Sequence, residues 1–353
     1  MTALKLGSLF DGIGVFPLAA MHCGMEPMWA SEIEARPISI TKRHFPDMLH
    51  LGDITKISGA EIPPVDVITF GSPCQDLSQI GTRNGFAGKK SSLFYQAMRI
   101  IEEMRYATNG RYPAFTVWEN VAGAFSSNDR LDFAAMLRAF TGAEVSVPPR
   151  GWAHAGMVRG GRADTAWRLL DAQYWGEPAL VQRRKRVFVV ADFAGQRAGE
   201  VLFKPRTVLP FSEIGSSGGL SATQRGGVPA AQTGRQVPVV RPFSLRRMRT
   251  MAQVGDQKGF CASFGRGGEP FPTLLASVTA PFSFWYEGEE RDGFLRVLTP
   301  LECERLMGLP ENWTKYGCKN EEISDHARYR ALGNSIALPC AEYVMAGIAE
   351  VMN

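Results

Sequence analysis

The sequence of 353 residues lacks the features that would tie it to a metal or a membrane. Its six cysteines form no C-x-x-C pair and no cluster with histidine at the spacing of metal ligands. This scattering argues against a zinc site and a disulfide framework, and it indicates a reducing compartment. No run approaches the length of a membrane span, and Met1–Leu6 starts no long apolar segment, so we expect a cytosolic protein without a bound metal.

Two phosphate-binding patterns are also missing. The turn after the first predicted strand reads Phe-Asp-Gly-Ile-Gly, at 10–14, which is not the G-x-G-x-x-G pattern of dinucleotide sites, and no Gly-Lys-Ser/Thr follows it. Neither a dinucleotide-dependent oxidoreductase nor a nucleoside triphosphatase is therefore favoured. The net charge is only +4, so evidence for nucleic-acid binding must come from local charge.

What the sequence does contain is a cysteine on a stiff turn. The apolar, β-branched run Val65–Thr69 predicts a buried strand, and it leads into Gly71-Ser72-Pro73-Cys74. Pro73 fixes its own φ and favours an extended Ser72, so the thiol would be aimed at the carboxyl edge of a sheet, where open α/β sheets bind ligands. A small buried hydrophobic residue is the alternative interpretation of Cys74, and this stretch alone leaves both open.

The first strand, turn and helix are typical of the opening of a nucleotide-binding α/β domain. Leu4–Phe10 predicts the strand, Asp11–Gly14 a tight turn and Val15–Cys23 the helix. The glycines would let a ligand approach the backbone, and the N-terminus of the helix could receive a carboxylate. A purely structural turn is the alternative, because Gly-x-Gly by itself is a weak signal.

Three carboxylates are predicted near this ligand-binding edge. Glu32 follows a strand over Met28–Ser31, a position where α/β domains hold ribose hydroxyls. Glu119 follows a strand over Ala114–Trp118 that would end beside the Pro-Cys turn, and Asp53 lies in a turn. For the carboxylates at 32 and 53, a solvated side chain or a helix cap is the alternative.

Positive charge is concentrated in three segments. The loop 78–90 combines three glycines with three cations, which predicts a mobile basic loop that could close over a substrate, or else an ordinary solvated loop. Four consecutive cations, Arg183–Arg186, run into a strand that extends to Val190, and strand alternation would group Gln182, Arg184 and Arg186 on one side. The third cluster consists of Arg241, Arg246, Arg247 and Arg249.

The composition changes near Phe193. From there to about Phe294 the chain is rich in Gly, Ser, Pro, Arg and Gln and has little helical periodicity, which predicts a second, irregular domain of strands and coil. We therefore expect a catalytic and cofactor-binding domain over 1–193, a smaller domain over 194–294 and a return segment, 295–353, that completes the first domain.

Regular structure is expected to resume in the return segment. Pro300–Met307 predicts a helix that Thr299 caps and Gly308 ends. Leu332–Ile336 predicts a turn, and Ala337–Val351 predicts a last helix that packs back on the first domain.

Six motifs, in order along the chain, resemble those of the cytosine-5 DNA methyltransferase family. They are Leu9-Phe10-Asp11-Gly12-Ile13-Gly14, Gly71-Ser72-Pro73-Cys74-Gln75, Glu119-Asn120-Val121, Gln182-Arg183-Arg184-Lys185-Arg186, Leu298-Thr299-Pro300-Leu301-Glu302-Cys303 and Gly333-Asn334-Ser335. The irregular segment falls where the family has its target-recognition domain. One departure is Val15, where members often have a further glycine.

The resemblance implies the Rossmann-like α/β sheet of S-adenosyl-L-methionine-dependent methyltransferases with a smaller, irregular β/coil target-recognition domain. It also implies methyl transfer to carbon 5 of a flipped-out cytosine in double-stranded DNA, because a stacked base is out of reach. Restriction–modification enzymes of bacteria and phages are of this kind, so we expect a cytoplasmic, monomeric enzyme.

The resemblance assigns a role to each catalytic candidate. Cys74 would add to carbon 6 of the base and make carbon 5 nucleophilic. Glu119, with a raised pKa in a closed site, would give N3 a proton or a strong hydrogen bond. Arg184 would hold the carbonyl oxygen of the base, and Arg186 would support it or orient Glu119.

The resemblance also implies two sets of binding residues. For the cofactor, Phe10 would lie against the adenine, the turn 11–14 near the methionine portion, Glu32 on the ribose hydroxyls and Asp53 on the adenine amino group. The expected cofactor-binding residues are Phe10, Asp11, Gly12, Ile13, Gly14, Glu32, Ile33, Asp53, Ile54, Pro73, Asn334 and Ser335. The expected DNA-binding residues are Arg83, Lys89, Lys90, Arg241, Arg246, Arg247, Arg249 and Thr273.

Two other functions fit parts of the pattern. An RNA cytosine-5 methyltransferase would share the fold, but the long basic segment before Leu298 favours a reader of a DNA groove. A catalytically silent DNA-binding or scaffold protein would keep the fold as well. The presence of Cys74, Glu119 and Arg184 argues against a silent protein.

Overall fold

The computed structural model describes residues 3–72, 93–204 and 293–353, together with the short pieces 239–242, 271, 273–274 and 282–286. For 239–242, 282–286 and 293–296 the description covers the backbone. Several predicted site residues therefore lie outside the described residues. They are Pro73, Cys74, Arg83, Lys89, Lys90, Arg246, Arg247 and Arg249.

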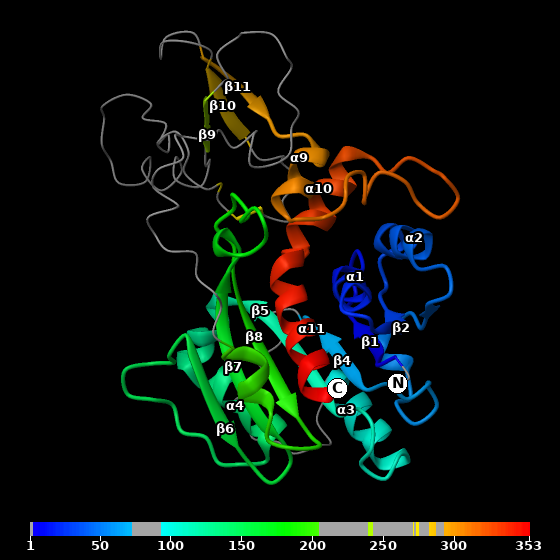
Figure 1. The fold of residues 1–353 in the computed structure, drawn as a ribbon, viewed down its shortest axis with the longest axis vertical. Helices are drawn as coiled ribbons and strands as arrows, with labels where there is room; N and C mark the ends of the chain where they lie inside the picture. The colour runs from blue at the N-terminus through cyan, green and yellow to red at the C-terminus, as the bar shows by residue number, and fades with distance from the viewer. Residues whose placement is uncertain are drawn as a thin grey trace.

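An eight-stranded sheet with the order β3-β2-β1-β4-β5-β8-β7-β6 forms the centre of the fold (Figure 1). The strands are β1 (Lys5–Leu9), β2 (Glu26–Ser31), β3 (Leu49–His50), β4 (Val67–Phe70), β5 (Phe115–Val121), β6 (Ala155–Arg159), β7 (Asp164–Asp171) and β8 (Lys185–Asp192). The strands β1 to β5 pair in parallel, whereas β8 joins β5 in antiparallel orientation and is followed by antiparallel β7 and β6. The sheet and its helices confirm the predicted α/β fold.

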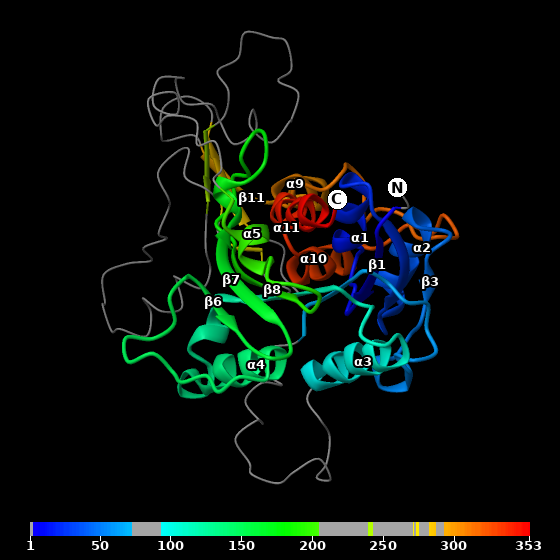
Figure 2. The ribbon, with the colours of Figure 1, turned by 60° about the horizontal axis from the view of Figure 1, so that its bottom comes forward.

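Helices cover both faces of this sheet, as Figure 2 shows: α3 and α4 lie on one side and α1, α10 and α11 on the other. The α-helices are α1 (Val15–His22), α2 (Ala35–His44), α3 (Leu93–Ala107), α4 (Leu131–Thr141), α5 (Ala198–Leu202), α9 (Pro300–Leu306), α10 (Asp325–Asn334) and α11 (Leu338–Met352). Short 3-10 helices are η1 (Ile54–Lys56), η3 (Ala122–Phe125), η4 (Ser127–Arg130) and η5 (Ala172–Tyr174).

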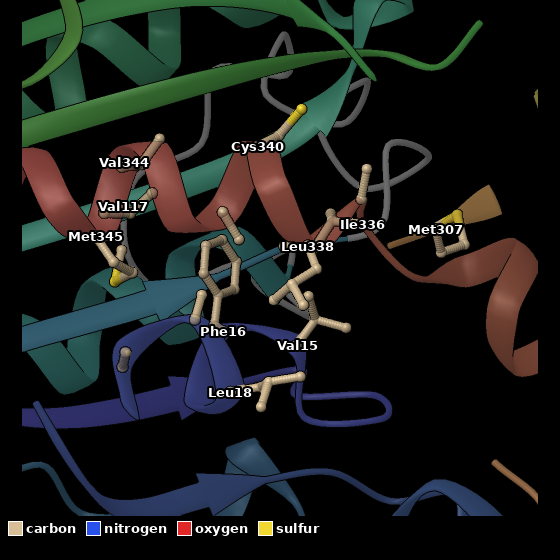
Figure 3. Packing of buried hydrophobic residues seen from close by; sticks show 14 of the residues in the cluster. Val15, Phe16, Leu18, Val117, Met307, Ile336, Leu338, Cys340, Val344 and Met345 are labelled. Carbon is tan, nitrogen blue, oxygen red and sulfur yellow. The ribbon is translucent and has the colours of Figure 1, made fainter. Parts of the chain in front are cut away.

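Each face of the sheet carries its own hydrophobic core. On one face, side chains of α1 meet those of α11, including Phe16, Val344 and Met345 (Figure 3). Full burial of an aliphatic or aromatic side chain of this size contributes about 1.5–3 kcal/mol. The last helix therefore packs on the first strand–helix unit, as predicted.

The second core, on the α3 and α4 face, is built largely from aromatic rings. Phe133 of α4 is fully buried, and its ring lies 5.6 Å from Trp167 and 4.8 Å from Phe125 between centroids. Trp118 of β5 belongs to this core, whereas its neighbour Val117 belongs to the other one. This alternation means that successive residues of β5 serve opposite faces of the sheet.

Local signals explain where several elements begin and end. Helix α9 starts, as predicted, after Thr299, where a capping box forms because Thr299 and Glu302 exchange hydrogen bonds. Gly308, with φ of 72°, follows the end of α9.

The predicted turn at Leu332–Ile336 is partly wrong, because α10 continues through Asn334. Its inward position is taken by Arg328, whose guanidinium pairs with the buried carboxylate of Glu304 at 3.1 Å. A charged residue at a core position hides the apolar periodicity by which a helix is predicted. The edge strand β6 was not expected either, and its residues are largely exposed.

A three-stranded antiparallel sheet with the order β11-β10-β9 lies apart from the central sheet (Figure 1). It consists of β9 (Val239–Pro242), β10 (Phe282–Tyr286) and β11 (Gly293–Val297). The strands β9 and β10 lie in the segment where strands and coil were expected.

We predict that Phe133→Ala lowers the free energy of unfolding by about 3–5 kcal/mol, because it leaves a cavity among aromatic rings that cannot close in. The measurement is urea-induced unfolding. Leu131→Ala, at a half-exposed position of the same helix, is the matched control and should lower it by less than about 1 kcal/mol. Equal losses in both variants would contradict the assignment of Phe133 to the core.

Candidate active site

A cavity of about 640 Å³ opens where β1, β2, β4 and β5 end. Parallel sheets bind ligands at this edge, and small-molecule sites commonly have volumes of roughly 300–1,000 Å³. Most residues predicted to bind the cofactor line the cavity. They are Phe10, Asp11, Gly12, Ile13, Glu32, Ile33, Asp53, Ile54, Asn334 and Ser335.

Gly14 differs from the other predicted cofactor residues, because it does not line the cavity. It has φ of 77° at the start of α1, and an added Cβ would lie 2.8 Å from the ring of Phe45. Both the backbone conformation and the close approach of a ring require glycine there. Gly14 therefore shapes the turn by packing against Phe45 and does not line the cavity.

Backbone hydrogen bonds fix the turn over residues 10–14. The N–H of Asp11 donates to the carbonyl of Ser31 at 3.1 Å, and the N–H of Gly12 donates to the Glu32 carboxylate at 2.9 Å. From the return segment, the indole N–H of Trp313 donates to the carbonyl of Ile13 at 2.8 Å. The turn is thus held between the end of β2 and the C-terminal part of the chain.

The carboxylates of Glu32 and Asp53 are held by hydrogen bonds from nearby residues of the chain. Glu32 accepts additional hydrogen bonds from the backbone N–H groups of Ile33 and Glu34, at 2.7 and 3.0 Å. Asp53 accepts from the backbone and the hydroxyl of Thr55, and these bonds lower its pKa. Asp53 therefore caps η1 and also lines the cavity, so the two interpretations of this residue hold together.

The carboxyl group of Asp11 is buried and only partly paired. Its Oδ1 accepts a hydrogen bond of 2.6 Å from the hydroxyl of Ser8, and its Oδ2 is buried without a hydrogen-bond partner among the described residues. Burial raises the pKa of Asp11 to about 7, with a contribution from nearby Glu32 and against the effect of the Ser8 hydrogen bond.

Glu119 and Arg186 form an ion pair inside the cavity. Nε of Arg186 lies 2.9 Å from Oε1 of Glu119, and the two side chains are only 14% and 12% exposed. They come from neighbouring strands, because Glu119 on β5 pairs with Phe188 of β8, two residues from Arg186. Burial raises the pKa of Glu119 more than the two cations Arg186 and Arg184 lower it.

The chain that leads toward Cys74 enters the wall of this cavity. The carbonyl of Ser72 accepts from the amide of Asn120 at 2.9 Å, and its hydroxyl accepts from the indole of Trp118 at 3.0 Å. Gly71 passes so close to Glu119 that an added Cβ would lie 3.1 Å from Oε2. The positioning roles of Trp118 and Asn120 were not predicted, although Asn120 is part of the Glu-Asn-Val motif.

Arg184 does not face the cavity with Arg186. It is 1% exposed, and its guanidinium donates to the carbonyls of Leu274, Gly333 and Ser335, the first two at 2.8 and 2.9 Å. Burial, with Arg186 nearby, lowers the pKa of Arg184 to about 9, so the group stays protonated at neutral pH.

The expected grouping of Gln182, Arg184 and Arg186 is therefore wrong. Residues 182–184 precede β8, which begins at Lys185, so strand alternation does not apply to them. Gln182 is also buried, and its side chain binds the carbonyl of Leu306 at 2.9 Å.

Thr273, expected to contact DNA, lines the cavity and donates from its hydroxyl to the carbonyl of Arg183 at 2.6 Å. The backbone of Phe271 is paired with the same stretch, through Val181 and Arg183 at 2.6 and 2.7 Å. Arg241 lies in β9, where the description covers the backbone.

The described residues also bear on a metal site and on a membrane span. In that part of the chain, no group of three or more His, Cys, Asp or Glu residues could hold a metal ion. No single helix in it is long and apolar enough to cross a membrane, and only the pair α10 and α11, bent by 43°, reaches that length and composition together.

Comparison with known proteins identifies the family. The model of the C-5 cytosine-specific DNA methylase family matches residues 4–205 and 244–350, and the chain belongs to this family. It is similar to Type II methyltransferase M.HhaI of Haemophilus parahaemolyticus, with 23% identity over 100% of this chain and 96% of the relative.

Two further similarities bear on length and fold. A DNA N-6-adenine-methyltransferase of Escherichia phage P1 is 24% identical over 98% of this chain, which spans 61% of that relative's length. The structure of the S. pombe Dnmt2 methyltransferase superposes with a TM-score of 0.59 at 15% identity, covering 99% of each chain, and so shows a shared fold.

We predict that Arg186→Gln raises the pKa of Glu119 further, because it removes the nearest cation that stabilises the carboxylate. The protonated acid would then persist to higher pH. Carbon-13 NMR of glutamate carboxyl groups measures this change. The control is Arg305→Gln, since Arg305 pairs with Glu311 away from the cavity. An unchanged or lowered pKa of Glu119 in Arg186→Gln would count against the pairing.

Proposed function

We propose that this protein is a DNA (cytosine-5-)-methyltransferase that uses S-adenosyl-L-methionine and acts on a flipped-out cytosine in a specific sequence of double-stranded DNA. The observation that carries the proposal is the shared cavity of the glycine turn and the Glu119–Arg186 pair, whose wall includes Ser72. Cys74 follows Ser72 by two residues in the sequence. Membership of the methylase family supports the same reaction.

The cavity suits this cofactor on three counts. The Oδ2 of Asp11, which has no hydrogen-bond partner among the described residues, offers negative charge to a cation. Gly12 has φ of 58° and open space where a Cβ would stand, so a ligand can approach the backbone. Glu32 and Asp53 offer carboxylate oxygens to hydroxyl and amino groups. When bound, the cofactor supplies an electrophilic methyl group.

Residues of the chain would activate the target cytosine. The thiolate of Cys74 would bond to carbon 6, which moves electron density to carbon 5. Glu119 would donate a proton or a strong hydrogen bond to N3 during this addition, and its raised pKa keeps more of it protonated. After methyl transfer, a base such as a water molecule would take the carbon 5 proton, the thiolate would leave carbon 6, and N3 would return its proton to Glu119, which restores the aromatic ring.

We assign the contact with the carbonyl oxygen of the base to Arg186, and not to Arg184 as the resemblance implied. Of the two, only Arg186 lines the cavity. Arg184 would act as a positioning residue, because its guanidinium ties Leu274 to Gly333 and Ser335 in the cavity wall.

We retain the expected domain division, with 194–294 as the target-recognition domain and 78–90 as a loop that closes on DNA. The three-stranded sheet, which is separate from the central sheet, supports the division. A monomer in the cytoplasm, serving a restriction–modification system, remains part of the proposal.

The decisive test is a covalent trap. With S-adenosyl-L-methionine and duplex DNA that contains 5-fluorocytosine at the target, the enzyme should form an adduct that survives denaturing electrophoresis, because fluorine blocks release of the thiolate. Cys74→Ala should form none and still bind the cofactor. Cys318→Ala, at an exposed cysteine, is the matched control and should form the adduct. An adduct in Cys74→Ala would refute the nucleophile assignment.

We expect the arginines of the recognition segment to contact phosphates. Replacing Arg246, Arg247 and Arg249 by Gln should weaken DNA binding and flatten the plot of log affinity against log salt concentration, by roughly 0.9 per lost contact. Arg162→Gln is the control, because Arg162 pairs with Glu102 and does not line the cavity. The same slope in the triple variant and the wild type would place the phosphate contacts elsewhere.

A further inference from the structure

The carboxyl group of Asp11 is only half satisfied, although it is held firmly at the cavity. Its own backbone is fixed on both sides, by the carbonyl of Ser31 and the N–H of Gly14 at 3.1 and 3.2 Å, and Oδ1 is bound to the hydroxyl of Ser8. The buried Oδ2 has no hydrogen-bond partner in the described residues. A buried carboxylate oxygen without a partner is costly, and a bound cation would remove that cost.

The surroundings of Asp11 do not supply that cation. Among the described residues that line the cavity, the charged groups are mostly acidic, and they are Asp11, Glu32, Glu34, Asp53, Glu119 and Arg186. The one arginine of this set pairs with Glu119. Glu34 pairs with Arg330 at 2.6 Å, and both of these side chains are exposed to solvent. Within the described walls no cation pairs with Asp11, and a cationic ligand can fill that role.

The methyl donor and the product of the proposed reaction differ in charge at one atom. The donor carries a sulfonium, and S-adenosyl-L-homocysteine, the product, carries a neutral thioether. Adenine, ribose, carboxylate and ammonium are common to both molecules. Residues that contact only these shared groups cannot distinguish the two, whereas a carboxylate beside the sulfur can.

We propose that Asp11 is the specificity-determining residue that lets this cavity favour the charged methyl donor over its neutral product. This inference rests on the proposed function. Pairing with Asp11 would strengthen donor binding and would be lost when the sulfur becomes neutral, so product release would be favoured. If Asp11 faced the ammonium group instead, donor and product would benefit equally, and that result would overturn the inference.

The test compares three ligands on the wild type and Asp11→Asn by isothermal titration calorimetry at pH 8. The ligands are S-adenosyl-L-methionine, S-adenosyl-L-homocysteine and sinefungin, which carries an ammonium-bearing carbon in place of the methylsulfonium. Loss of the carboxylate should weaken binding of the donor and of sinefungin about 10-fold or more, and binding of the product less than about 2-fold.

Asp53→Asn is the matched control, because it removes a carboxylate from the same cavity. Since Asp53 is expected at the adenine, which all three ligands share, its replacement should weaken them by similar factors. Thermal unfolding of each variant checks that the fold is retained. Similar factors for all three ligands in Asp11→Asn, or no weakening, would overturn the inference.

Proton release on ligand binding gives a second test. The pKa of Asp11 in the free protein is about 7, so near that pH a sulfonium should displace a proton from it. Calorimetry in buffers of different ionisation enthalpy should detect proton release when the wild type binds the donor or sinefungin, and less release with the product. In Asp11→Asn this difference between the ligands should disappear. Preference for the donor should rise as pH increases through this value, because Asp11 becomes charged.

Other titratable groups near the cavity must be separated from this effect. Glu32, directly after β2, and Asp53, after β3, contribute on one side, and Glu119 with Arg186 on the other. Proton release that persists unchanged in Asp11→Asn would assign it to one of these groups and overturn the inference. If the wild type bound none of the three ligands, the proposed cofactor itself would be wrong, and the inference would fail with it.

Discussion

The guanidinium of Arg184 joins parts of the chain that are far apart in the sequence. It donates to the carbonyl of Leu274, which lies between β9 and β10 in the sequence. It also donates to the carbonyls of Gly333 and Ser335 at the end of α10. Hydrogen bonds from a charged donor are worth roughly 1.5–3 kcal/mol each. A planar guanidinium spreads its donors over several directions, which the point charge of a lysine does not.

The consequence of this junction is a cavity with walls from three regions. The ends of β1, β2 and β5 supply the turn and the carboxylates, the stretch around Thr273 closes one side, and Asn334 and Ser335 close another. Gln182 reinforces the junction, because its amide binds Leu306 and its carbonyl accepts from the N–H of Leu274. Chemistry at Glu119 therefore depends on segments more than 150 residues away in sequence.

Sequence reasoning located the cavity because its signals are local. Each signal, a β-branched run, a glycine turn or an acidic residue at a strand end, is contained in a few consecutive residues. Together they predicted that Asp11, Glu32 and Glu119 meet at one sheet edge. The cavity brings these three together.

The burial of Arg184 could not be predicted in the same way. Its partners are backbone carbonyls, which every residue carries, so no side-chain pattern marks them. The same limit applies to α10, where Arg328 occupies the inward position and Glu304, its partner, comes from another helix. Pairing between distant segments decides both cases, and distant pairing leaves no periodic trace in a single sequence.

The electrostatics of the cavity set a constraint on the rest of the molecule. Its described walls carry five carboxylates and one arginine, yet the proposed partner is a polyanion. DNA phosphates would be repelled from such walls, so a flipped base must enter while its backbone stays outside. The cations that hold the backbone must then lie beyond the cavity, and the chain as a whole carries a net charge of +4. Under the proposed function, the acidic interior would draw the cationic donor inward, and cations outside the cavity would hold the DNA backbone.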